Sequence, residues 1–190
     1  MVGTERLKIL EVLIRDVITN EVAGDLVECG VWRGGCSIFM RAVLATLDDA
    51  GRTVWLFDSF QGLPKPEKPG DCDLSMFPYF SVSVETVKEN FRKFGLLDGQ
   101  VRFVPGWFKD TLPTSEVQEI AILRLDGDMY ESTFVALKSL YPKLSAGGYV
   151  IVDDYGAIPQ CHGAVNDFRA LFNIENVITP IDWTGIYWRK

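Results

Sequence analysis

Asp-Leu-Val-Glu-Cys-Gly-Val-Trp-Arg-Gly-Gly, residues 25–35, is the stretch that decides the fold of this 190-residue chain. Its first five residues are mostly apolar and predict a short β-strand, and the glycines that follow predict a tight turn that opens a helix. Such a turn lets the backbone pass close to a ligand. Residues 25–35 therefore predict a strand–turn–helix unit with a binding site at the end of the strand.

The same alternation continues along the chain. Further strand candidates are the apolar runs at 53–58, 101–105, 120–126 and 148–154. Helices are expected at 5–19, 34–47, 83–94, 132–144 and 162–172. The Gly147-Gly148 pair is expected to stop the fourth of these helices. Alternation of this kind predicts βαβ units and a parallel sheet.

Two strand candidates end the chain, at 176–181 and 185–189. The connection between them is short enough for a hairpin, so the last strand should run antiparallel to its neighbours. The predicted fold class is α/β, with a doubly wound, Rossmann-like, mostly parallel seven-stranded sheet and an antiparallel last strand.

Composition limits the classes of protein that this chain can belong to. A chain of this length, 47% apolar, can bury one sizeable core, so we expect a single domain over 1–190. The net charge of −7 is spread along the chain and argues against nucleic-acid and membrane partners. Its four cysteines fall at irregular spacings, as expected of reduced thiols in a cytoplasmic protein. No apolar run approaches the ~20 residues of a membrane span.

One segment breaks the alternation of strands and helices. Residues 64–83 contain four prolines mixed with aromatic side chains. Long irregular insertions in compact domains are usually lids or disordered loops. The aromatic residues favour a lid-like insertion.

Polar residues follow the first two strands, at the edge of the sheet where ligands of α/β proteins bind. Glu28 and Gly30 begin a turn that lacks the G-x-G-x-x-G spacing of dinucleotide sites, which favours a ligand without phosphates over a diphosphate. An ordinary structural turn is the alternative. Asp58 at the end of the second strand is placed to accept hydrogen bonds from ribose hydroxyls, with a helix N-cap as the alternative.

The third strand is followed by Gly106, Trp107 and Phe108. An exposed aromatic ring at this place could lie against an adenine ring. Packing of the same rings in the core is the alternative.

The strongest signal is a group of four carboxylates at the ends of two strands. Asp126 and Asp128 lie at the end of the fourth strand, and Asp153 and Asp154 lie at the end of the fifth. On adjacent parallel strands these acids would lie in one small volume, where their repulsion is costly unless a cation joins them. A hard divalent cation with oxygen ligands, Mg²⁺ by default, meets that need. Separate capping or solvated acids are the alternative.

Five stretches, LVECGVWRGG, LFDSFQGLP, VPGWFKDTLP, LRLDGDMYEST and GGYVIVDDYG, together resemble the macrocin O-methyltransferase family. Members of that family methylate sugar hydroxyls of natural products on the class I S-adenosylmethionine-dependent fold. The resemblance implies S-adenosylmethionine and Mg²⁺ as cofactors and a hydroxylated, sugar-bearing small molecule as the substrate. A homo-oligomer is left open.

The resemblance also implies residue roles. Asp126, Asp153 and Asp154 would bind Mg²⁺, and Asp128 would act as the general base. The residues expected to line the cofactor site are Glu28, Gly30, Trp32, Arg33, Ser37, Asp58, Ser59, Gly106, Trp107, Phe108 and Asp126.

Rival interpretations concern both function and single residues. A Mg²⁺-dependent phosphoryl-transfer hydrolase could use an Asp-x-Asp pair, and a binding protein could keep the fold without catalysis. His162 has a free pKa near neutral and could be a base, although a surface or capping role is favoured. Arg124, inside the fourth strand, should pair with an acid.

Overall fold

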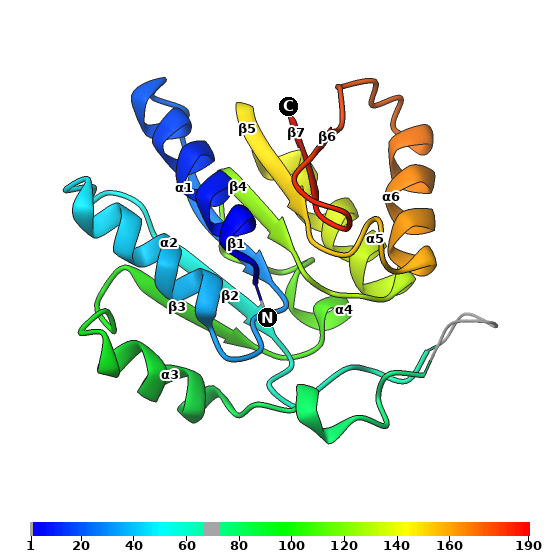
Figure 1. Cartoon of the computed structure of the whole chain (residues 1–190), viewed down its shortest axis with the longest axis horizontal. Helices are drawn as coiled ribbons and strands as arrows, with labels where there is room; N and C mark the ends of the chain where they lie inside the picture. Colours follow the sequence, from blue (N-terminus) through cyan, green and yellow to red (C-terminus); the bar gives the residue numbers. More distant parts are fainter. Residues whose placement is uncertain (1, 67–72) are drawn as a thin grey trace.

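A computed structural model describes residues 2–66 and 73–190, which form one seven-stranded sheet (Figure 1). The strand order is β3-β2-β1-β4-β5-β7-β6. The strands are β1 (Asp25–Cys29), β2 (Val54–Asp58), β3 (Val101–Pro105), β4 (Ile120–Leu125), β5 (Leu144–Val152), β6 (Thr179–Pro180) and β7 (Ile186–Arg189). Strands β1 to β5 pair in parallel, whereas β7 pairs antiparallel with β5 and β6. The mostly parallel sheet with an antiparallel last strand is confirmed.

Helices cover both faces of the sheet (Figure 1). One face carries α1 (Thr4–Thr19), α2 (Gly35–Thr46) and α3 (Val84–Lys93), and the other carries α4 (Phe108–Thr111), α5 (Tyr130–Leu140) and α6 (Pro159–Leu171). Each face has its own apolar core cluster. The doubly wound arrangement explains why all six residues of the central strand β4 are buried.

The pairing of β1 with β4 places two charged residues inside the sheet. Glu28 on β1 lies in register with Arg124 on β4, and both side chains are buried. Side chains in register on neighbouring strands point to the same face of a sheet. The two charges are therefore close enough to pair, which fixes the centre of the site described below.

The boundaries around β5 differ from those predicted. The fourth predicted helix ends at Leu140 rather than 144, and a short 3₁₀ turn, η2 (Tyr141–Lys143), follows it. Pro142 lies in that turn, and proline disfavours continuation of an α-helix. Gly147 and Gly148 belong to β5, where the pairing with β4 is irregular, so the expectation that they stop a helix was wrong.

Two smaller differences concern short elements. The strand expected at 176–181 is reduced to Thr179–Pro180, where the proline cannot donate a ladder hydrogen bond. The four-residue helix α4 was not predicted, because a single turn leaves no periodic pattern.

The predicted lid-like insertion at 64–83 falls partly outside the described residues, since 67–72 are not described. Its described part includes a 3₁₀ turn, η1 (Pro78–Phe80), and exposed Met76, Phe77 and Tyr79. The role of this segment as a lid stays a prediction. None of the helices in residues 2–66 and 73–190 has the length and apolar character of a membrane span.

Candidate active site

A cavity of about 930 Å³ opens at the carboxyl ends of the parallel strands. All but two of the residues expected to line the cofactor site lie in its wall: Glu28, Gly30, Trp32, Arg33, Asp58, Ser59, Trp107, Phe108 and Asp126. The four aspartates predicted for metal binding and catalysis lie there as well. The carboxyl ends of β1, β2, β4 and β5 thus contribute to one site, as expected for an open α/β sheet.

Two of the residues predicted to line the cofactor site, Ser37 and Gly106, are not part of the cavity wall that the described residues form. Ser37 is fully buried on α2, where its hydroxyl donates a hydrogen bond to Oε2 of Glu28. Ser37 therefore contacts Glu28, which lines the cavity, and does not line the cavity itself. Gly106 has φ +144°, and its backbone N–H donates to the Asp58 carbonyl at 2.9 Å. Gly106 turns the chain toward Trp107 rather than facing the cavity.

The glycine turn after β1 lies directly against the end of β4. Gly30 has φ +90°, and a Cβ placed on it would be 1.8 Å from the backbone oxygen of Asp126. The same approach allows the Asp126 N–H to donate to the Cys29 carbonyl at 2.8 Å. Only glycine has both the φ range and the small size that this contact requires.

Asp58 joins the turns after β1 and β2. Its Oδ2 accepts hydrogen bonds from the backbone N–H groups of Val31 at 2.7 Å and Trp32 at 3.2 Å, and its Oδ1 accepts from Phe60 at 2.7 Å. Burial raises the pKa of Asp58, and these backbone donors oppose the rise. The carboxylate keeps acceptor capacity toward the cavity. This capacity is compatible with the predicted contact between Asp58 and a ribose, which stays a prediction.

Trp32 connects the glycine turn to the segment before α3. Its indole Nε1 donates to the Tyr79 carbonyl at 3.1 Å, and the two ring centroids are 5.1 Å apart. The guanidinium of Arg33 lies 5.0 Å from the Trp32 ring centroid. Tyr79 and Phe80 thereby become part of the cavity wall, a role that the sequence analysis did not assign to them individually.

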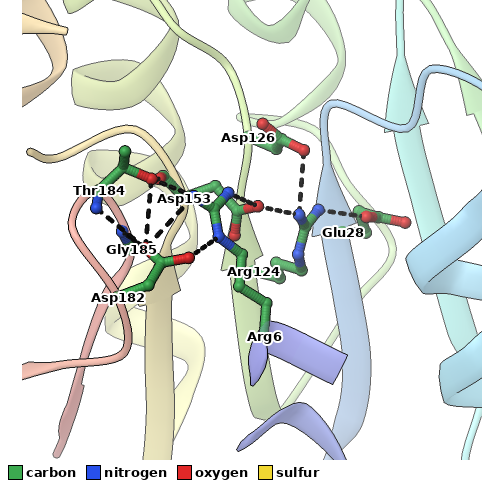
Figure 2. Close-up of polar contacts among 8 residues, drawn as sticks. All are labelled: Arg6, Glu28, Arg124, Asp126, Asp153, Asp182, Thr184 and Gly185. Carbon is green, nitrogen blue, oxygen red and sulfur yellow. Dashed lines mark hydrogen bonds and ion pairs between the residues drawn. The ribbon is translucent and has the colours of Figure 1, made fainter. Parts of the chain in front are cut away.

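Arg124 is the centre of an ionic network between the strands (Figure 2). It donates to Oε1 of Glu28, to Oδ2 of Asp153 and, at 3.0 Å, to Oδ2 of Asp126. Burial alone would lower the pKa of Arg124, but these carboxylates together raise it well above its usual value. Burial raises the pKa of Glu28 to about 7, although Arg124 and Ser37 favour its ionised form. The prediction that Arg124 pairs with an acid is confirmed.

Asp126, Asp128 and Asp154 form a tight cluster of carboxylates. One oxygen from each lies within 4.8 Å of the others. Burial and the neighbouring carboxylates raise the pKa of Asp128 to about 7 and that of Asp154 to about 9. Two buried carboxylate oxygens, Oδ1 of Asp153 and Oδ2 of Asp154, have no hydrogen-bond partner among the described residues. Such orphaned acceptors in an anionic cavity fit a divalent cation with oxygen ligands.

Asp153 differs from the other three aspartates in its contacts. Its Oδ2 is held by Arg124 and also by Arg6, whose Nη1 lies 2.9 Å away. Arg6 comes from the first turn of α1, and together with Val2 and Leu7 it adds the start of the chain to the cavity wall. Sequence reasoning missed Arg6, because a charged residue on an amphipathic helix reads as a solvent-exposed one.

His162 lies outside the cavity wall formed by residues 2–66 and 73–190. It is exposed on α6, where its ring stacks on Tyr155 with centroids 4.3 Å apart. No contact in the described part of the chain gives His162 the role of a base at the aspartate cluster.

The family model of the macrocin-O-methyltransferases matches residues 1–190. The chain belongs to the macrocin O-methyltransferase family. It is 50% identical to demethyldecarbamoylnovobiocin O-methyltransferase of Streptomyces niveus, over all of this chain and 75% of that protein. It is 45% identical to mycinamicin III 3''-O-methyltransferase of Micromonospora griseorubida, over all of this chain and 78% of that protein.

Solved structures agree with this assignment. The O-methyltransferase NovP superposes with a TM-score of 0.97 at 50% identity, covering all of this chain and 81% of NovP. The calicheamicin methyltransferase CalS11, at 22% identity, has a TM-score of 0.76 over 97% of this chain and 78% of its own, and shows the shared fold. The chain is therefore an S-adenosylmethionine-dependent O-methyltransferase of class I fold, as the sequence predicted.

Proposed function

We propose that this enzyme methylates a sugar hydroxyl of a small natural product, using S-adenosylmethionine and Mg²⁺. The observation that carries the proposal is the cluster of Asp126, Asp128 and Asp154, which faces the same cavity as the glycine turn at Gly30. The cavity volume is of the size that encloses a small molecule. The named substrates of the relatives support an acceptor of the glycosylated natural-product class.

The turns after β1 and β2 suit the methyl donor. The donor supplies a methyl group already activated on a sulfonium. Glu28, held by Arg124 and Ser37, offers an anionic wall beside the turn, and Asp58 offers a carboxylate for the ribose hydroxyls. Trp107 and Phe108 present aromatic faces for the adenine. These side chains would bind and orient the donor in the cavity that the aspartates also line.

Asp126, Asp153 and Asp154 would hold Mg²⁺, which when bound lowers the pKa of an acceptor hydroxyl. Asp128 would take the proton from that hydroxyl. In the metal-free site, burial and the carboxylates of Asp126 and Asp153 raise the pKa of Asp128 to about 7. Asp153 is buried and Asp126, Asp128 and Asp154 are half-buried, which limits access of water to the reacting groups.

Replacing Asp128 by Asn tests the base. We expect S-adenosylhomocysteine to bind this variant as it binds the wild type, and turnover of demethyldecarbamoylnovobiocin or mycinamicin III to fall by about 10²–10⁴-fold, the usual contribution of a general base. The measurement is product formation by mass spectrometry beside calorimetric binding. Full activity of Asp128→Asn would remove the base assignment.

The geometry also offers Asp128 as a metal ligand, because it belongs to the 4.8 Å cluster and Asp153 does not. Magnesium titration of Asp128→Asn and Asp153→Asn separates the two assignments. As proposed, Asp153→Asn weakens Mg²⁺ binding strongly and Asp128→Asn weakens it less. The reverse order would make Asp128 the third ligand.

The metal dependence is tested by measuring methyl transfer to either acceptor with and without Mg²⁺. Methyl transfer that is indifferent to Mg²⁺ would contradict the metal part of the proposal. Metal-stimulated methyl transfer would support the proposal.

A further inference from the structure

Arg6 joins three parts of the molecule that are far apart in the sequence (Figure 2). From α1 it donates through Nη1 to Asp153 at the end of β5, at 2.9 Å. Through Nε it donates to Oδ2 of Asp182 at 2.7 Å, and through Nη2 to the hydroxyl of Thr184. Asp182 and Thr184 both lie in the connection between β6 and β7. One guanidinium therefore links the first helix, the last hairpin and a proposed metal ligand.

Asp182 and Thr184 are themselves held by hydrogen bonds. Oδ1 of Asp182 accepts from the backbone N–H groups of Thr184 at 2.9 Å and Gly185 at 2.6 Å. The Thr184 hydroxyl in turn donates to the backbone carbonyl of Asp153 at 2.7 Å. The hydrogen bond from Arg6 is the main reason that the pKa of Asp182 lies well below its usual range. Asp182 is thus ionised near neutral pH and keeps Arg6 in place.

The two oxygens of Asp153 are used unequally. Arg6 and Arg124 both donate to Oδ2, whereas Oδ1 is buried without a partner among the described residues. Two cationic donors on one oxygen hold the carboxylate in one orientation and keep that oxygen away from any other cation. Asp153 can then offer one oxygen and cannot readily chelate with both.

We infer that Arg6 is a positioning residue, which holds Asp153 as a one-oxygen ligand and so favours Mg²⁺ over Ca²⁺. Mg²⁺ requires near-ideal octahedral geometry, while Ca²⁺ accepts six to eight oxygens and often chelating carboxylates. The inference rests on the proposed function, because it takes Asp153 to be a metal ligand. It goes further in assigning metal selectivity to a residue outside the ligand set.

Charge and geometry can be separated in this site. Loss of the Arg6 charge strengthens the attraction of the site for any divalent cation, and by Coulomb's law the effect is similar for two ions of charge +2. Loss of the Arg6 hydrogen bonds leaves Asp153 held by Arg124 alone, and this looser carboxylate suits Mg²⁺ less well and makes chelation of Ca²⁺ easier. The effect of charge therefore largely cancels in the ratio of the Mg²⁺ and Ca²⁺ affinities. A change in this ratio reflects a change in the geometry of Asp153.

The test measures MgCl₂ and CaCl₂ binding by calorimetry on the full chain. We expect Arg6→Gln to lower the Mg²⁺/Ca²⁺ affinity ratio by about tenfold, the low end of the losses seen when a partner of a metal ligand is removed. Arg6→Lys keeps the charge but cannot bridge Asp153 and Asp182 with a planar fork, so its ratio should fall as well. Arg15→Gln is the matched control, since Arg15 lies on the same helix and pairs with Glu11 in solvent.

Two outcomes separate this inference from the proposed function. Wild-type protein that binds Mg²⁺, with an unchanged ratio in Arg6→Gln and Arg6→Lys, overturns the role of Arg6 and leaves the function standing. Wild-type protein that binds no Mg²⁺ overturns the metal part of the function, and the inference with it. If Arg6→Gln does not fold, Asp182→Asn, which removes the anchor without touching Asp153, must lower the ratio, and an unchanged ratio refutes the inference.

Discussion

Substitution of Gly30 by Ala should destabilise the protein by an amount that follows from the structure. A Cβ at Gly30 would lie 1.8 Å from the Asp126 carbonyl oxygen, whereas separations under 3.0 Å are essentially not seen. The turn after β1 and the end of β4 must therefore move apart by more than an ångström. Overpacking of this kind costs about 1–3 kcal/mol. The positive φ at residue 30 adds about 1–2 kcal/mol for a residue with a Cβ. We expect a total loss of about 2–5 kcal/mol in the free energy of unfolding.

Urea unfolding followed by circular dichroism measures this loss as a lower midpoint at similar slope. Gly35→Ala is the control, because no atom beyond its chain neighbours and its own helix backbone lies within 4 Å of its Cβ position, and its φ is ordinary. As the first residue of α2, position 35 should tolerate Ala with a change of at most about 1 kcal/mol, and that change should be stabilising. Equal midpoints for Gly30→Ala and wild type would refute the argument from close approach.

Three further predictions concern pH, the cofactor and the core. The pKa values of Asp128 (about 7) and Asp154 (about 9) are raised in the metal-free folded state, which therefore holds protons that the unfolded chain has lost. The stability of the metal-free protein, measured by thermal unfolding, should fall as the pH rises from about 5 to 9. A flat stability profile would contradict this prediction. Asp58→Asn should weaken S-adenosylhomocysteine binding about 10–100-fold by calorimetry, since hydrogen bonds to charged groups contribute about 1.5–3 kcal/mol; unchanged affinity would exclude the ribose contact. Phe91→Ala removes a fully buried ring and should cost about 3–5 kcal/mol in urea unfolding, with exposed Phe94→Ala as the control.

The sheet and the position of the cavity followed from the sequence because both depend on local patterns. Apolar runs spaced by helical segments define parallel strands, and parallel strands bring their carboxyl ends to one edge. Glu28, Asp58, Asp126 and Asp153 were therefore placed in one site from their positions alone. The boundary prediction at Gly147 and Gly148 was wrong, because a glycine pair is compatible both with an irregular strand pairing and with the end of a helix.

Contacts between distant residues were beyond sequence reasoning. Arg6 and Asp153 are 147 positions apart, and nothing in either local pattern indicates that they meet. The choice between Asp128 and Asp153 as the third metal ligand depends on side-chain orientation, and the orientation of Asp153 is set by Arg124 and Arg6 rather than by the order of residues. The family resemblance implied Ser37 as a cofactor contact, yet its hydroxyl donates to Glu28.

The protonated state of the aspartate cluster has a consequence for calorimetry. A carboxyl such as Asp154, whose pKa is raised to about 9, must give up its proton when a cation takes its place, because metal ligands bind in their deprotonated form. The released proton is taken up by the buffer, whose own heat of ionisation adds to the signal. Titrations repeated in buffers of different ionisation enthalpy should give apparent heats on a straight line, and its slope counts the protons that leave.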